Sequence, residues 1–116
     1  MADSFTSTED TELLNSIASV HMMFGMYESA QSILQLSDWI ERHNIATLKL
    51  LSDVYLKQKN ADLALQTIDR LEKEISPEPL SANDIYLKAR ALALLGQNEE
   101  ARQVMLNRGQ SQIMEA

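Results

Sequence analysis

The feature that most constrains the fold of this chain is a step of 34 residues that repeats along it. When residues 11–44 are laid over residues 45–78, small residues fall on small ones and large apolar residues on large apolar ones. The matching pairs are Leu14 and Leu48, Ile17 and Leu51, Ala18 and Ser52, Ala30 and Ala64, and Leu34 and Ile68. Small residues let backbones approach, and large residues fill the gaps. This period predicts stacked helical hairpins.

A third copy begins near Ala82, after an insertion of three residues relative to the first step. In this copy Ala89 and Ala101 take the places of Ala18 and Ala30. Three copies are enough for neighbouring hairpins to bury a continuous apolar interior. Arrays of this kind usually hold another polypeptide rather than carry out chemistry, so we expect a binding protein.

Composition excludes several other classes of protein. The chain has 116 residues, of which 45% are apolar, as in an ordinary single domain with a modest core. It has no cysteine, which excludes a disulfide framework and a thiolate site. The start Met1-Ala-Asp-Ser has neither a basic nor an apolar run, so no secretory signal is expected. No apolar stretch approaches the ~20 residues that span a bilayer.

The negative charge of the chain lies mostly in its first third. The net charge is −7, and residues 1–44 alone hold seven acidic residues and one basic residue. Residues 45–81 have a net charge of −1, and residues 82–116 have none. An acidic first third disfavours nucleic acid, which binds basic surfaces. It suits a basic or neutral protein partner, or serves only solubility.

Apolar residues at a helical period predict an all-α chain of three antiparallel hairpins. The expected helices cover residues 11–24, 27–41, 45–58, 61–75 and 82–95, and a last helix ends near residue 108. Gly25 and Gly96 are expected to end the first and fifth helices, and the prolines of 76–79 to end the fourth.

Polar residues mark where the helices begin. Asn44, Asn60 and Asn98 precede the third, fourth and sixth helices, where a side-chain oxygen accepts from the first free amides. Ser81, with Asp84 three residues later, resembles a capping box at the start of the fifth helix. These residues therefore predict four N-caps.

The same positions resemble the tetratricopeptide repeat, in which a large residue, Leu, a small residue and an aromatic mark the first helix. The second copy reads Leu48, Leu51, Ser52 and Tyr55, and then Ala64 early in the second helix. The first copy reads Leu14, Ile17, Ala18 and His21 before Ala30, and the third reads Ile85, Lys88, Ala89 and Leu92 before Ala101. The departures are the missing early tryptophan, Lys59 in place of the turn glycine, and Lys88 in place of leucine.

The resemblance implies three repeats, at residues 11–44, 45–81 and 82–108, in a short right-handed solenoid with a concave groove. A flexible N-terminal tail at 1–10 and a C-terminal tail at 109–116 are expected outside them. The first helix of each repeat lines the groove of the family, which binds an extended peptide or an amphipathic helix. The positions expected to face a partner are Asn15, Ser19, Met22, Lys49, Asp53, Leu56, Tyr86, Arg90 and Ala93.

Several residues admit two readings. Met23 and Phe24 either fill the core against the second helix or join a flexible, methionine-rich binding surface with Met22 and Met26. Trp39 either packs at the junction with the second repeat or projects toward a partner. The charged residues Asp69, Arg70, Glu72, Lys73 and Glu74 predict a solvated helix face with local ion pairs.

No motif predicts chemistry. His21 and His43 have no paired histidine or cysteine, and there is no glycine-rich phosphate loop, nucleophile elbow or HExxH. We therefore expect no enzyme activity, no metal and no cofactor. The basic clamp by which some tetratricopeptide proteins bind acidic C-termini is also missing, because its places hold Asn15, Ser19, Asn83 and Leu87.

Within the family, the chain is similar to the small acidic chaperones of bacterial type III secretion systems. The likeness rests on size, acidity, absent cysteine, three repeats and the segment Asp38-Trp39-Ile40-Glu41, which is similar to Glu-Trp-Leu in needle-subunit chaperones. It implies a cytoplasmic chaperone that shields a small secreted or self-polymerising protein, in some cases with a second small helical protein. The alternatives are a general scaffold or adaptor, and a non-catalytic helical subunit of a larger complex. The isolated chain is expected either to be only marginally stable or to self-associate.

Overall fold

The repeated apolar positions fold the chain into consecutive helices. The computed structural model describes residues 7–115, and the side chains of residues 8–107. This part of the chain contains six helices and no strand, so the all-α prediction is confirmed. The helices are α1 (Ser7–Met23), α2 (Tyr27–Ile40), α3 (Ile45–Lys57), α4 (Ala61–Ile75), α5 (Ala82–Leu94) and α6 (Asn98–Glu115).

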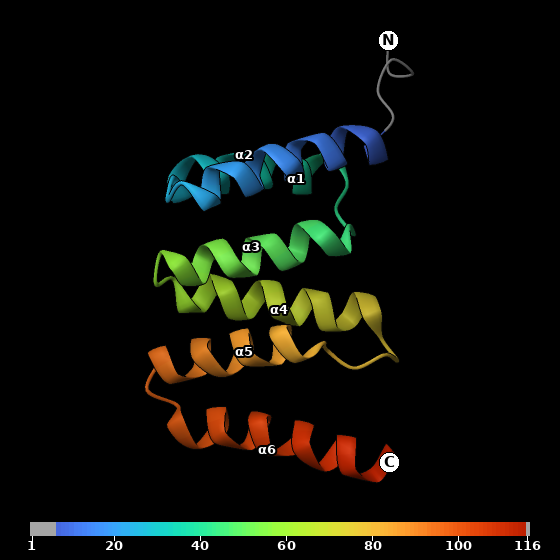
Figure 1. Ribbon diagram of the computed structural model, residues 1–116, viewed down its shortest axis with the longest axis vertical. Helices are drawn as coiled ribbons and strands as arrows, with labels where there is room; N and C mark the ends of the chain where they lie inside the picture. Colours follow the sequence, from blue (N-terminus) through green and yellow to red (C-terminus); the bar gives the residue numbers. More distant parts are fainter. Residues whose placement is uncertain (1–6, 116) are drawn as a thin grey trace.

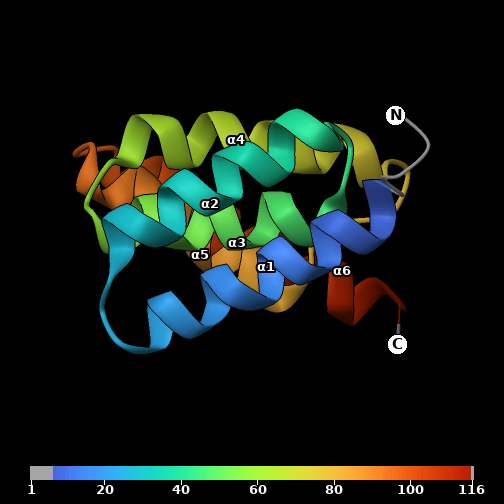
Figure 2. The same ribbon diagram turned by 90° about the horizontal axis from the view of Figure 1, so that it is seen from above.

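Short turns make each helix return along its predecessor, so that α1–α2, α3–α4 and α5–α6 are antiparallel pairs. The pairs stack along the long axis of the molecule (Figure 1). The extents of the molecule along its three principal axes are 50, 29 and 20 Å. The first helices of the pairs contact one another, α1 with α3 and α3 with α5, while α2 packs on α3 and α4 on α5. Seen from above, α2 and α4 lie on one side of the stack and α1 on the other (Figure 2).

Three of the four predicted N-caps are confirmed. The side chain of Asn44 accepts from the amide of Thr47 at 3.0 Å, and that of Asn60 accepts from Leu63 at 3.3 Å. Ser81 Oγ accepts from the amide of Asp84 at 3.3 Å. Each bond satisfies an amide that the first turn leaves without a helical partner. The prediction for Asn98 is wrong by one position, because α6 begins at this residue.

The turn inside each pair has one residue in the left-handed region, at the same place in the repeat. These residues are Gly25 with φ 74°, Lys59 with φ 61° and Gly96 with φ 80°. Glycine adopts this conformation without a steric penalty, whereas a residue with a Cβ does not. Gly25 and Gly96 therefore follow the ends of α1 and α5 as predicted, and Lys59 adopts the glycine conformation at a cost.

Two helix ends lie outside the predicted limits. α1 begins at Ser7, although residues 1–10 were expected to form a tail, and residues 1–6 lie outside the described part. Glu9 and Asp10 in the first turn favour this earlier start, since negative charge is stabilised at a helix N-terminus. α6 passes Gly109 and continues to Glu115, although residues 109–116 were expected to form a tail. One glycine costs a helix about 1 kcal/mol, which does not by itself end it.

The core lies between the pairs, where the repeat places its small and large residues. Ala18, Ala30 and Ala64 are fully buried and let the helices approach. The large side chains of Leu34, Leu48, Leu51, Ile68 and Leu71 are at most 2% exposed and fill the space between them. Burying an aliphatic side chain of this size contributes roughly 1.5–3 kcal/mol, so these positions supply much of the stability.

Candidate functional site

The nine residues expected to face a partner all come from α1, α3 and α5. We call the side of the stack on which these helices lie next to one another the first-helix face. The structure leaves Met22, Asp53, Tyr86, Arg90 and Ala93 at least partly exposed on these helices. It places two of the predicted residues, Asn15 and Leu56, in the interior instead.

The prediction that Leu56 anchors a partner is wrong. Its side chain is 1% exposed and belongs to the same buried cluster as Leu87 and Ala91 of α5. Leu56 therefore packs the junction between the second and third pairs. A helical period alone does not separate a groove position from a junction position one residue away on the same helix.

The prediction that Asn15 faces the groove is also wrong, because Asn15 is 7% exposed and joins three helices. Its amide Nδ2 donates to Thr47 Oγ1 of α3 at 3.0 Å, and its Oδ1 accepts from Ser37 Oγ of α2 at 2.9 Å. Ser37 and Thr47 are fully buried. Buried polar groups need partners, and these three side chains satisfy one another at the first junction. The sequence contained a weak signal for this, since Ser37 and Thr47 interrupt otherwise apolar positions.

The second junction has an ion pair at the corresponding positions. The 34-residue step relates Asn15 to Lys49, and the step of 37 residues that follows relates Thr47 to Asp84. Lys49 Nζ lies 3.3 Å from Asp84 Oδ2, and the Asp84 side chain is 2% exposed. Ser81 Oγ also donates to Asp84 at 2.8 Å. Lys49 is 44% exposed, so it remains on the first-helix face while its charge compensates a buried carboxylate.

A depression between α1 and α3 contains three of the predicted contacts. It is open to solvent, has a volume of about 340 Å³, and is lined by Ser19, Met22, Met23, Tyr27, Leu50, Asp53 and Lys57. Ser19 Oγ donates to the Asn15 carbonyl within α1 at 2.9 Å, so its hydroxyl is already satisfied. The lining combines thioether and aliphatic surface with one acidic and one basic side chain. Such a lining can accept an apolar side chain flanked by charges.

A second depression, of about 290 Å³, lies between α5 and α6 at the other end of the stack. Its lining is Tyr86, Ala89, Arg90, Ala93, Ala101, Arg102 and Met105. Tyr86 is 51% exposed, and the Arg90 guanidinium carbon lies 5.7 Å from the centre of its ring. At that distance the cation and the ring attract each other, which restrains both side chains. The three predicted residues of α5 are thus brought together.

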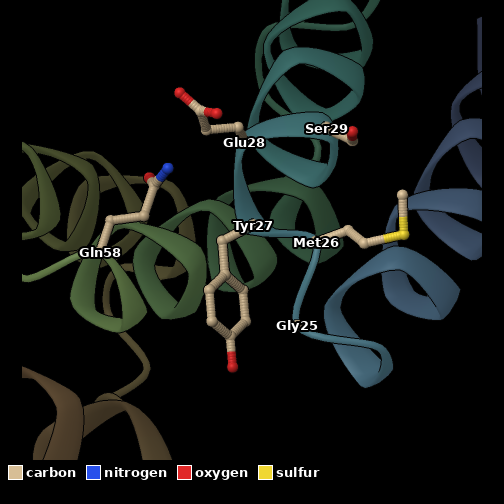
Figure 3. Close-up of a pocket in the computed structure, with 6 residues that line it drawn as sticks. All are labelled: Gly25, Met26, Tyr27, Glu28, Ser29 and Gln58. Carbon is tan, nitrogen blue, oxygen red and sulfur yellow. The ribbon is translucent and has the colours of Figure 1, made fainter.

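Met26 lines a third depression, at the turn between α1 and α2. It has a volume of about 380 Å³ and is formed by Gly25, Met26, Tyr27, Glu28, Ser29 and Gln58. Figure 3 shows Met26 and Tyr27 pointing in different directions from the turn, with Gln58 reaching in from the end of α3. Met26 is 49% exposed, so it is available for contact but lies at the rim of the stack.

Three large apolar side chains, for which the sequence allowed either packing in the interior or contact with a partner, are exposed. Met23 is 81% exposed and Phe24 is 76% exposed, so the expectation that they fill the core against α2 is wrong. Trp39 is also 76% exposed, which excludes packing at the junction with the second pair. Its repeat counterpart, Lys73, is solvated too, so this position faces outward in both pairs.

Most charged residues of the face predicted on α4 pair with residues outside α4. Asp38 of α2 accepts from Arg70 through two hydrogen bonds of 2.7 and 3.0 Å, and Arg70 also donates to the Arg42 carbonyl at 2.9 Å. Asp38 thereby holds the pKa of Arg70 above its ordinary value, mainly through these hydrogen bonds. The remaining pairs are Glu72 with Lys88 at 2.7 Å, Glu74 with His43 at 2.8 Å, and the local pair of Asp69 with Lys73 at 3.0 Å.

Within the described residues, no three His, Cys, Asp or Glu side chains are placed to hold a metal ion. No helix in residues 7–115 is long and apolar enough to cross a membrane. Comparison of the chain with protein-family models and with curated proteins finds no match in either set.

Proposed function

We propose that this protein binds a segment of another polypeptide along its first-helix face. On this proposal the three pairs form a short tetratricopeptide-like solenoid, and α1, α3 and α5 line its concave side. The contacts between first helices support this curvature, because α1, α3 and α5 meet in succession whereas α2 and α4 do not. Helices that lie closer on one side of a stack make that side concave.

The observation that carries the proposal is the pair of open, partly apolar depressions at the two ends of the first-helix face. One contains Met22 and Leu50, and the other contains Tyr86 and Ala93. Lys49 lies on α3 between them and is 44% exposed. Two apolar anchor sites separated by polar surface fit an amphipathic helix or an extended strip with apolar residues at both ends. In a typical interface, a few anchor residues contribute most of the binding free energy and their many neighbours contribute little.

We further propose that the bound segment belongs to a small secreted or self-polymerising protein of a type III secretion system. The support is the similarity of size, acidity and the segment 38–41 to such chaperones. A subunit that polymerises outside the cell must be kept from polymerising inside, and a chaperone that covers its helix shifts that equilibrium. On this proposal the protein acts in the bacterial cytoplasm and can share its cargo with a second small helical protein.

Retention of cellular proteins by immobilised variants tests the proposal. The wild type is compared with Met22→Asp and Tyr86→Ala, which change one depression each, and with Glu99→Ala, which changes an exposed residue outside both. We expect one or a few small secreted proteins to be retained by the wild type and by Glu99→Ala. Retention falls at least tenfold in the other two variants. Full retention by both of them, with helical circular dichroism intact, contradicts binding at this face.

A scaffold or adaptor is the second candidate, and the exposed Trp39 on α2 favours it. Its side chain is 76% exposed, and α2 lies on the side of the stack opposite to α1 (Figure 2), so it offers a second contact surface, which a scaffold uses to join two proteins. Trp39→Ser distinguishes the two functions. A chaperone keeps its cargo soluble on co-expression whether or not Trp39 is present. A scaffold loses one of two retained proteins in this variant and keeps the other.

A further inference from the structure

An apolar stripe on α1 is left uncovered. Leu13, Ile17 and Val20 of α1, with Phe24 in the turn directly after it, follow the spacing that places residues on one face of a helix. They are 61%, 40%, 50% and 76% exposed. We call these four residues the α1 stripe. Apolar residues on both sides of a helix are typical of a helix that is buried on both sides.

The repeat shows how the positions of the α1 stripe are used elsewhere in the chain. One step further along, the counterparts of Leu13, Ile17 and Val20 are Thr47, Leu51 and Val54, which are at most 2% exposed. The counterpart of Phe24 is Gln58, which is partly exposed. Two steps along, Asp84 and Ala91 are buried to the same extent, whereas Leu95 is 38% exposed. Lys88, at the position of Ile17, is partly exposed and pairs with Glu72 of the preceding α4 at 2.7 Å. In α3 and α5 these residues pack on the preceding pair, as the Lys49–Asp84 contact shows. The positions of Leu13, Ile17 and Val20 therefore have the register of a junction, and among the described residues no helix packs on this side of α1.

The opposite end of the stack carries the complementary surface. The depression between α5 and α6, which we call the end recess, includes Tyr86, Ala89, Ala93, Ala101 and Met105. The counterparts of its last four members in the second pair are Ser52, Leu56, Ala64 and Ile68, which are at most 1% exposed. Those counterparts are buried because a following first helix, α5, packs on α3 and α4. The end recess thus corresponds to the surface of the second pair on which the next first helix, α5, packs.

We propose that the α1 stripe of one molecule docks into the end recess of a second copy of this chain, so that the copies stack head to tail. The contact reproduces the junction that the chain already makes twice within itself. Charge favours the pairing of stripe with recess over the pairing of two stripes or of two recesses. Arg90 and Arg102 line the end recess, while Asp10 and Glu12 precede the α1 stripe. The acidic third of one copy, with a net charge of −6, then meets a third with none.

A head-to-tail contact leaves one stripe and one recess free on every assembly, so further copies add in the same way. The average size of the assemblies therefore rises with concentration instead of stopping at a dimer. This inference does not require a bound peptide, although the end recess is also the second depression of the proposed peptide site and Met105 lines it. The purified protein without any cargo is therefore used in the test, so that self-association is measured apart from peptide binding.

Sedimentation velocity over a wide concentration range tests the proposal with two blocked variants. Val20→Asp places a charge in the stripe, and Met105→Asp places one in the recess, where the side chain is 41% exposed. Each variant alone is expected to weaken self-association at least tenfold. An equal mixture of the two is expected to form a dimer that does not grow, because one intact stripe and one intact recess remain. Trp39→Ser, a control on an outward position, leaves the assembly of the wild type unchanged.

Three results overturn the proposal. The first is a wild type that stays monomeric at all concentrations. The second is self-association of Met105→Asp at wild-type strength, which shows pairing of stripe with stripe. The third is a mixture of the two variants that forms no dimer although circular dichroism shows both to be folded. If Val20→Asp fails to fold, Leu13→Gln takes its place, since Leu13 is 61% exposed and glutamine suits a helix.

Discussion

The ion pair at the second junction yields an asymmetric prediction for the stability of the protein. Lys49→Asn removes the charge that compensates the Asp84 carboxylate, which is 2% exposed and keeps only the Ser81 hydroxyl at 2.8 Å. Breaking a fully buried pair by removing one partner costs about 3–5 kcal/mol. The Lys49 side chain is 44% exposed, so solvent already screens the pair, and we expect a loss of about 2 kcal/mol.

The reverse change is expected to cost less. Asp84→Thr frees Lys49, which is already close to solvent and can hydrate, so we expect a loss of about 1 kcal/mol from the missing polar contact. The double variant, Lys49→Asn with Asp84→Thr, copies the Asn15–Thr47 hydrogen bond of 3.0 Å from the first junction. It is expected to be more stable than Lys49→Asn alone, by about 1 kcal/mol or more.

Urea unfolding followed by circular dichroism measures these differences, and a loss of about 2 kcal/mol corresponds to a fall in Tm of roughly 6–12 °C. Lys73→Asn is the matched control, because this lysine is 76% exposed and forms only a local pair with Asp69. It is expected to cost less than about 0.5 kcal/mol. Additive effects of the two changes at the junction, or a cost of Lys49→Asn equal to that of the control, refute the reasoning.

Three further variants test other features by the same unfolding measurement. Lys59→Gly removes the steric strain of a residue with a Cβ at φ 61°, and we expect the free energy of unfolding to rise by up to about 1 kcal/mol, even though glycine makes the unfolded chain more flexible. The control Gln58→Gly, at φ −89°, has no such strain to remove and is expected to lower the stability. Asn15→Leu removes the hydrogen bonds of Asn15 to Ser37 and Thr47 and leaves these buried hydroxyls with only their mutual contact of 3.3 Å and the bond of Thr47 to Asn44, for an expected loss of about 2 kcal/mol, and a neutral result contradicts the buried network. Trp39→Ser is expected to change stability by less than about 0.5 kcal/mol, because the ring is 76% exposed, and a larger loss contradicts the outward position.

Much of the fold follows from the sequence because the repeat encodes it redundantly. Asn44, Asn60 and Ser81 mark helix starts through local chemistry, which depends only on neighbours three residues away. Gly25 and Gly96 mark the turns through the left-handed conformation. These signals need no knowledge of tertiary contacts, and they place four of the helix starts to the residue.

The candidate site is less predictable, since it depends on which side of each first helix its neighbours cover. Asn15 and Leu56 have the helical phase of groove residues, yet the hydrogen bonds of Asn15 and the packing of α5 on Leu56 bury both. Phe24 is a large aromatic residue of the kind that fills cores, yet it lies in the turn after α1 and is 76% exposed. Residues 32 positions apart, such as Asp38 and Arg70, pair in a way that local charge patterns do not reveal.

Exposure in this chain is decided by the presence of a neighbouring pair rather than by residue type. Leu34, Ile68 and Met105 occupy the same position of the first, second and third pairs. Leu34 and Ile68 are at most 1% exposed, while Met105 is 41% exposed. All three are large apolar residues, and the third lacks only a helix packed above it. At both ends of the described stack, apolar side chains such as Leu13 and Met105 stand exposed at positions that are buried between the pairs, so these ends can receive a further helix. That is the physical basis for expecting a further helix, from a second copy, at each end.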